Sequence, residues 1–270
     1  MGTAKRERQK RGRQDRLAIA ERQRQRRQRI KTIRNFAIVV LLIVIALFVL
    51  SRRDAGNSSN RAGFPYGTGA CPNPDGSSPR TIDFSAAPKQ CIDPSKTYTA
   101  TFDTTAGTVV VKLDAKSTPG TVNNFVVLAR YHYYDGTQLF RASSSLGILQ
   151  GGSPHDNSTG DKGPGYDLPD EGFDYASLTQ GASGATGGPY KYVAGDLVMA
   201  RAARANGASA QFFFGVNDNV SQLDSQGVYV RFGSTTEGLD VLQRILASAP
   251  QDNGPPNPPV TINSVTITES

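Results

Sequence analysis

Residues that bind metals through sulfur or imidazole are scarce in this sequence of 270 residues. They are two cysteines, Cys71 and Cys91, and two histidines, His132 and His155. So few of them exclude a zinc ribbon, an iron–sulfur cluster and any metal site built mainly from these residue types. We expect both histidines in exposed loops or at a helix end. The glycine-rich residues 163–165 are not followed by Lys-Ser, Lys-Thr or a helix, so they predict no phosphate loop. No cofactor is expected.

The two cysteines lie in residues 53–96, a segment rich in Gly, Ser, Asn and Pro that is typical of a linker. If this segment lies outside the cytoplasm, oxidising conditions favour a disulfide between Cys71 and Cys91. Such a bond would contribute about 3 kcal/mol by closing the loop between them. Two free thiols are the alternative. Neither cysteine is a candidate nucleophile, because a linker offers no base and no pocket.

Basic charge is concentrated at the N-terminus. Residues 1–35 contain 14 Lys or Arg and 3 Asp or Glu, so the formal net charge of +7 comes from this tail and the rest of the chain is mildly acidic. A nucleic-acid-binding domain would carry positive charge on its folded surface, so no nucleic acid partner is expected. The tail has no apolar stripe and is expected to be solvated, with RNA or anionic-lipid contact as alternatives.

Residues 36–50 form an unbroken apolar run that predicts a membrane-spanning segment. The run is short, since a spanning helix needs about 17–25 residues, but Lys31 and Arg34 can reach the headgroups and extend it. A cleavable signal peptide is the alternative. No small-x-small cleavage site follows the run, which favours an uncleaved anchor over residues 36–52. The positive-inside rule then predicts a single-pass protein of the cell membrane, with residues 1–35 cytoplasmic and the rest outside.

From residue 98 onward, short alternating segments predict strands. Residues 98–104 and 108–113 flank a Thr-Ala-Gly turn and predict a hairpin. In the segment 211–215, alternation places Phe212 and Phe214 in the core and Phe213 on the opposite face. Further strands are predicted over residues 138–141, 147–150, 196–200, 228–232 and 260–268.

Two helices accompany these strands. Ser117 or Thr118 before Pro119 predicts a helix start, with apolar residues at helical spacing up to residue 129. A second helix is predicted over residues 237–246. Many short strands with two helices predict a mainly β fold, a closed antiparallel barrel capped by the helices.

Six motifs follow one another along the chain: residues 121–125 (TVNNF), 133–137 (YYDGT) leading to Phe140-Arg141, 149–154 (LQGGSP), 163–171 (GPGYDLPDE), 195–201 (GDLVMAR) with 211–214 (QFFF), and 230–233 (VRFG) with 237–240 (EGLD). Taken in this order, they resemble the motifs of cyclophilin-type peptidyl-prolyl isomerases. The resemblance extends over about residues 97–269, and the tail, apolar run and Cys-bearing linker resemble membrane-tethered bacterial members. We therefore expect an isomerase domain over residues 97–270.

The resemblance implies a closed eight-stranded barrel capped by two helices, with a proline-binding groove on its outer face. It implies that Arg141 is the catalytic arginine and that Gln150 is the glutamine supporting it. The substrate-binding residues that it implies are Leu146, Ile148, Ala200, Arg201, Ala202, Gln211, Phe213, Leu223 and Tyr229.

The sequence departs from the family pattern at several groove positions. The spacing between Arg141 and Gln150 is one residue longer than is usual in the family. Residues 142–147 lack the expected pocket phenylalanine, and Leu146 is expected to fill its space. Arg201 replaces a common asparagine, and Gln222 stands where cyclosporin-sensitive members have tryptophan. Ser153 stands where aspartate is usual, and the loop 206–210 is one residue longer. These changes bear on turnover and drug sensitivity more than on the fold.

The function implied is peptidyl-prolyl cis-trans isomerisation in extracytoplasmic proteins during folding. The expected partners are proline-containing polypeptides, and membrane lipid through the anchor. The alternative is a module of the same fold that binds proline-containing segments with little catalysis, and the altered loop over residues 142–147 motivates it.

Overall fold

The computed structural model describes residues 63–181 and 184–270. The expected basic tail (1–35) and anchor (36–52) lie outside the described residues, as does the first part of the expected linker. Among the residues that are described, no helix combines the length and the apolar character needed to cross a bilayer.

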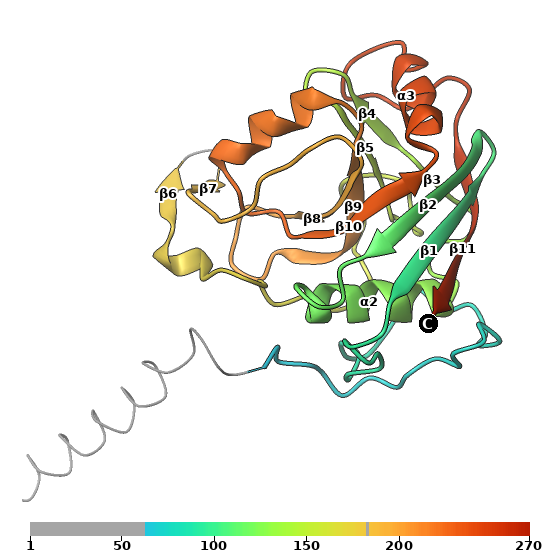
Figure 1. Cartoon of the computed structure of the whole chain (residues 1–270), viewed down its shortest axis with the longest axis vertical. Helices are drawn as coiled ribbons and strands as arrows, with labels where there is room; N and C mark the ends of the chain where they lie inside the picture. The colour runs from blue at the N-terminus through green and yellow to red at the C-terminus, as the bar shows by residue number, and fades with distance from the viewer. Residues whose placement is uncertain (1–62, 182–183) are drawn as a thin grey trace, which may run out of the picture. The chain divides into compact units, whose positions relative to one another are not determined.

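A curled antiparallel sheet of nine strands forms the body of this region (Figure 1). Its order is β3-β11-β1-β2-β10-β8-β9-β5-β4. The strands are β1 (Tyr98–Thr104), β2 (Gly107–Leu113), β3 (Thr137–Gln138), β4 (Arg141–Ser143), β5 (Ile148–Gly151), β8 (Asp196–Arg201), β9 (Ala208–Gly215), β10 (Arg231–Glu237) and β11 (Thr261–Glu269).

The hairpin of β1 and β2 is confirmed, with Tyr98 paired to Leu113 and Thr104 paired to Gly107. Its alternating residues place one face in the core, as in Phe102, which is 1% exposed. Gly107 has φ +133°, a conformation that side chains disfavour, so glycine suits this tight turn.

The sheet is not the closed eight-stranded barrel that the sequence predicts. The strand expected over residues 138–141 is divided into β3 and β4, because Leu139 and Phe140 between them turn into the interior and are buried. β3 pairs with β11 and β4 pairs with β5, so these short strands are the two ends of the described sheet. The result is a half-barrel with nine strands.

The two expected helices are present as α2 (Pro119–Arg130) and α3 (Leu239–Ala247). Figure 1 shows them on opposite sides of the curled sheet, and α2 contacts β9 and β11 whereas α3 contacts β2, β4 and β5. Thr118 occupies the N-cap position of α2 but makes no side-chain cap. The carboxylate of Glu171 instead accepts hydrogen bonds from the N–H groups of Gly120 and Thr121, both at 2.8 Å. A buried anion therefore caps α2 from a distant loop.

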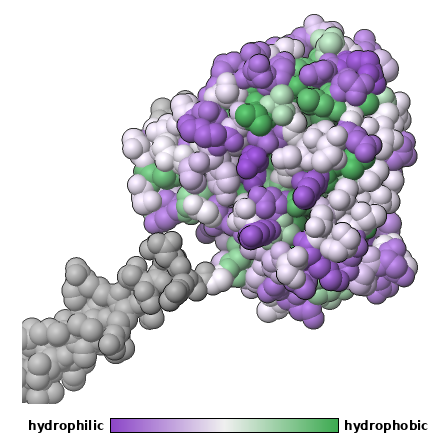
Figure 2. Space-filling model, viewed as in Figure 1, coloured by the Kyte–Doolittle hydropathy of each residue, from purple (hydrophilic) through white to green (hydrophobic). Residues whose placement is uncertain are grey.

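Aromatic rings fill the interior between the sheet and α2. Phe102 and Phe125 contact each other, with ring centroids 5.9 Å apart, and both contact Phe212. The rings of Phe214, Phe232 and Tyr134 complete the cluster. Large apolar side chains are mostly buried, and the face seen in Figure 2 is accordingly mostly hydrophilic, with small apolar patches.

An excursion over residues 172–190 leaves the main sheet between β5 and β8. It contains the 3₁₀ helix η1 (Tyr175–Ser177) and a separate two-stranded sheet of β6 (Thr179–Gly181) and β7 (Gly184–Thr186). A second 3₁₀ helix, η2 (Asp218–Ser225), follows β9. None of these elements is expected from the sequence.

The described part of the expected linker, residues 63–96, forms an N-terminal arm that lies against α2 (Figure 1). The predicted disulfide between Cys71 and Cys91 is present, with a Cα–Cα distance of 5.5 Å. The side chain of Asn123 in α2 holds the arm, accepting a hydrogen bond from the N–H of Cys91 (2.7 Å) and donating one to the carbonyl of Lys89 (3.0 Å).

Candidate active site

A groove of about 510 Å³ lies over β4, β5, β8, β9 and η2. All of the catalytic and substrate-binding residues that the resemblance implies line this one groove. They are Arg141, Leu146, Ile148, Gln150, Ala200, Arg201, Ala202, Gln211, Phe213, Leu223 and Tyr229.

A row of polar side chains crosses the groove from β4 to β9. Arg141 in β4 donates from Nη1 to Oε1 of Gln150 (2.8 Å), its direct partner in the pairing with β5. Gln150 donates to Oε1 of Gln211 (2.9 Å), and Gln211 donates to the carbonyl oxygens of Ser158 and Thr159, both at 3.3 Å. Each amide is thereby oriented by the next, so the guanidinium meets a fixed acceptor.

An apolar pocket lies beside this row. Phe213 belongs to it and is 3% exposed, whereas its neighbours Phe212 and Phe214 belong to the main core, as the alternation predicts. Tyr229 packs edge-to-face on Phe213, with centroids 5.7 Å apart. Ile148, Leu223 and the half-buried Leu146 complete the pocket.

The opposite wall consists of Ala200, Arg201 and Ala202 at the end of β8. The side chain of Arg201 is only 3% exposed. Its guanidinium lies over the ring of Tyr175 (4.5 Å) and over that of Phe173 (5.2 Å), and pairs with Asp170 (3.0 Å). A caged cation of this kind anchors the excursion over residues 172–190 to the groove wall.

Two residues that sequence reasoning missed hold side chains of the groove in place. Asn253, in the turn after α3, accepts hydrogen bonds from Nε (3.0 Å) and Nη2 (2.6 Å) of Arg141. Gln226 accepts a hydrogen bond from the hydroxyl of Tyr229 (2.9 Å). The Asn253-Gly254 dipeptide is a turn signal that could have drawn attention to this position, but its distance in sequence from Arg141 hides the contact. The other lining residues are Thr159, Asp161, Lys162, Asp167, Arg204, Gly207 and Ser209.

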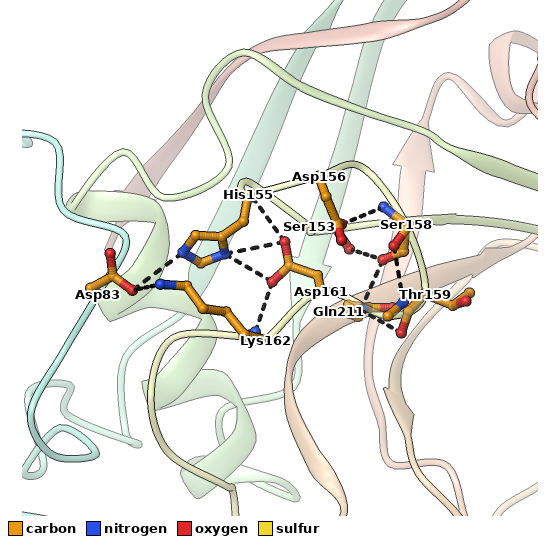
Figure 3. Close-up of polar contacts among 11 residues, drawn as sticks. Asp83, Ser153, His155, Asp156, Ser158, Thr159, Asp161, Lys162 and Gln211 are labelled. Atoms are coloured by element: carbon orange, nitrogen blue, oxygen red, sulfur yellow. Dashed lines mark hydrogen bonds and ion pairs between the residues drawn. The ribbon is translucent and has the colours of Figure 1, made fainter.

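The rim of the groove holds His155 between two carboxylates (Figure 3). Its Nδ1 lies 2.9 Å from Asp161, and its Nε2 lies 3.3 Å from Asp83 in the N-terminal arm. Lys162 pairs with the same Asp83 at 2.7 Å. Burial raises the pKa of Asp161, but the hydrogen bonds from His155 and Gly163 outweigh it and leave the pKa below its ordinary value. His155 is therefore a half-buried rim residue, not the exposed one expected.

The cationic side chains of the groove differ in the charge of the groups that they contact. Lys162 and Arg204 pair with aspartates, the latter with Asp167 at 2.8 Å, whereas the partners of Arg141 are neutral amides. Burial raises the pKa of Tyr229, so its hydroxyl stays protonated at neutral pH. Within the described ranges, no cluster of three His, Cys, Asp or Glu side chains is placed to hold a metal ion. The arrangement offers a fixed cationic donor beside an apolar pocket.

Comparisons with known proteins agree with one another. The family model described as cyclophilin type peptidyl-prolyl cis-trans isomerase/CLD matches residues 99–267. A peptidyl-prolyl cis-trans isomerase of Helicobacter pylori is 35% identical over 153 residues, which are 56% of this chain and 82% of the relative. Peptidyl-prolyl cis-trans isomerase B of Bacillus subtilis is 36% identical over 129 residues, 48% of this chain and 76% of the relative.

A solved structure is also similar. It is the cyclophilin type peptidyl-prolyl cis-trans isomerase of Cryptosporidium parvum, crystallised in the presence of the dipeptide Ala-Pro. The TM-score is 0.47 and the identity 24%, over 64% of this chain and 99% of that chain.

Proposed function

Because the chain belongs to the family of cyclophilin-type peptidyl-prolyl cis-trans isomerases, it accelerates rotation about X–Pro peptide bonds, and we propose that Arg141 supplies the donor that lowers the barrier. The uncatalysed rotation has a barrier of about 18–20 kcal/mol. No covalent bond is made or broken, so the reaction needs neither a nucleophile nor an acid–base pair. What it needs is stabilisation of the twisted amide.

Twisting removes the resonance between the carbonyl and the prolyl nitrogen, and the nitrogen lone pair then becomes a hydrogen-bond acceptor. An arginine has five N–H donors in one plane. Three of those of Arg141 are engaged by Gln150 and Asn253, which leaves two for the substrate on a side chain already fixed. This fixed guanidinium at the edge of the groove is the observation that carries the proposal.

The apolar pocket formed by Ile148, Phe213, Leu223 and Tyr229 fits a proline ring. The pocket can hold the proline ring still while the carbonyl of the preceding residue rotates about the X–Pro bond. Gln211 and the end of β8 lie alongside and are placed to bind the polypeptide backbone.

A single preorganised donor contributes about 3–4 kcal/mol to a transition state. Since each 1.36 kcal/mol is a factor of ten, Arg141 accounts for roughly two to three decades of rate. Desolvation of the amide in the pocket and preferential binding of the twisted form supply the rest.

We further propose that the enzyme works outside the cytoplasm, tethered to the cell membrane by residues 36–52, on polypeptides folding there. The apolar run, the basic residues before it and the Cys71–Cys91 disulfide support this, since structural disulfides persist in oxidising compartments. Recovery of mature chains beginning after residue 50 from the medium would contradict the tether. In intact cells, an added protease should remove the isomerase domain, and retention of that domain until lysis would contradict the outward orientation.

The activity itself is tested by exchange NMR on an Ala-Pro peptide, with the full-length protein at catalytic concentration. Cis–trans exchange should accelerate with the wild-type protein, and the acceleration by Arg141→Ala protein should be smaller by about 10²–10³. Equal acceleration by both proteins would refute the role of Arg141.

A further inference from the structure

The turn between α3 and β11 reaches back to the catalytic edge of the sheet. Its backbone is tied to β4, because the N–H of Ala142, next to Arg141, donates to the carbonyl of Gly254 (2.7 Å). Asn253 therefore has a fixed distance to the arginine, although more than a hundred residues separate them along the chain.

The side chain of Asn253 meets the guanidinium through one atom. Its Oδ1 accepts from both Nε (3.0 Å) and Nη2 (2.6 Å) of Arg141, which are the two N–H groups on one edge of the guanidinium plane. Gln150 accepts from Nη1 on the other side (2.8 Å). Two acceptors on different sides of one planar group fix both its position and its rotation.

The orientation of the Asn253 amide is itself determined. Its Nδ2 donates to Oδ2 of Asp252 (2.9 Å), so the amide oxygen faces the arginine. Asp252 in turn accepts hydrogen bonds from Ser143 (3.0 Å) and from the hydroxyl of Ser145 (2.7 Å). Asn253 thus binds Arg141, where this segment begins, and Asp252 binds Ser143 and Ser145, just before Leu146 in the pocket.

We infer that Asn253 is a positioning residue for Arg141 and sets the guanidinium plane against the prolyl nitrogen. Because its amide is neutral, Asn253 fixes the plane without placing a carboxylate in direct contact with the guanidinium. The backbone agrees with this role: Asn253 has φ +63°, a left-handed conformation that asparagine tolerates better than most residues. The inference rests on the proposed role of Arg141.

The test is a double-mutant cycle in the full-length protein. Asn253→Gly removes the acceptor and keeps the left-handed backbone. It should lower kcat about tenfold with KM nearly unchanged, because alignment matters in the transition state and not in ground-state binding. In the Arg141→Ala background, where the protein concentration is raised to measure the residual turnover, Asn253→Gly should cost nothing further. Gln251→Ala, which shortens another exposed amide in the same turn, is the matched control and should keep wild-type turnover.

An equal loss from Asn253→Gly in both backgrounds would show a merely structural role and overturn the inference. Unchanged turnover in Asn253→Gly, with a clear loss in Arg141→Ala, would overturn it too and leave the role of Arg141 intact. Unchanged turnover in Arg141→Ala would instead refute the proposed role of Arg141.

A spectroscopic measurement tests the contact without activity. The Nε–H of Arg141 should exchange slowly with solvent in the wild-type protein, and at least tenfold faster in Asn253→Gly. Asn253→Asp keeps an acceptor and should keep the slow exchange, while its kcat falls because a carboxylate compensates the charge. Fast Nε–H exchange in the wild-type protein or in Asn253→Asp would contradict the assigned contact.

Discussion

Truncation of Arg141 to alanine removes the donor from the groove while leaving the apolar pocket in place. A preorganised hydrogen-bond donor stabilises a transition state by about 3–4 kcal/mol. Without it, kcat/KM for an Ala-Pro peptide should fall by about 10²–10³. The loss should appear mainly in kcat, because the ring-binding residues Phe213 and Leu223 are untouched and continue to bind the ground state.

The same substitution should leave the fold intact. Arg141 is half-buried at the edge of an open groove of about 510 Å³, so water can reach the amides of Gln150 and Asn253 once the guanidinium is gone. The free energy of unfolding should therefore fall by about 1 kcal/mol or less. Denaturant unfolding of both proteins gives this value, and it separates a loss of chemistry from a loss of structure.

The variant Arg141→Lys separates the effect of the positive charge from that of the guanidinium geometry. A lysine restores the positive charge but not the planar fork, so it cannot bind Gln150 and Asn253 together and should recover only part of the rate. A folded Arg141→Ala protein with wild-type turnover would mean that the groove works by pocket shape alone. Full recovery by lysine would mean that charge, not orientation, is what the groove requires.

Three other substitutions probe the pocket, the cap of α2 and the N-terminal arm. Phe213→Ala should raise KM and lower the free energy of unfolding by about 3–5 kcal/mol in denaturant melts, since the ring is almost fully buried. Glu171→Ala should cost about 1–3 kcal/mol in the same assay, because two buried N–H groups of α2 lose their acceptor. His132→Gln should flatten the pH dependence of the melting temperature. The carboxylate of Asp135 and then the carbonyl of Gly76 raise the pKa of His132 above 6.5, so its stabilisation is complete below that pH and is lost as pH rises through the raised pKa. A wild-type melting temperature that does not fall on raising the pH from 6 to 8 would contradict this.

Much of the sheet could be predicted because local pattern and tertiary packing agree there. β1 and β2 alternate cleanly around a glycine turn, and the helix over residues 237–246 has apolar residues at helical spacing that α3 buries. The strand expected over residues 228–232 is displaced, since β10 begins only at Arg231. The preceding residues pack toward the groove, where Tyr229 contacts Phe213 and Val228 joins the excursion cluster. Tertiary contacts prevailed over local propensity at this point.

The groove was predicted through its motifs, and the parts that were not predicted depend on long-range contacts. Arg201 was expected to bind substrate and does line the groove, but the cage around its guanidinium was not predicted, because the walls Phe173 and Tyr175 come from an excursion with no regular pattern. Asn253 could not be found from spacing, because no periodicity relates it to Arg141. Sequence pattern locates residues on an element, whereas contacts between loops arise only when the chain is folded.

The neutrality of the partners of Arg141 connects the fold to the chemistry. Lys162, Arg201 and Arg204 lie in the same groove and each pairs with an aspartate. A carboxylate close to a cation compensates its charge and stabilises it before any substrate arrives, so a paired cation has less to gain from a developing lone pair. Arg141 is fixed instead by amide oxygens, which supply geometry without a compensating charge. The groove thus contains several cations, and Arg141 is the one that amide oxygens hold in a fixed orientation beside the apolar pocket, as the proposed donor role requires.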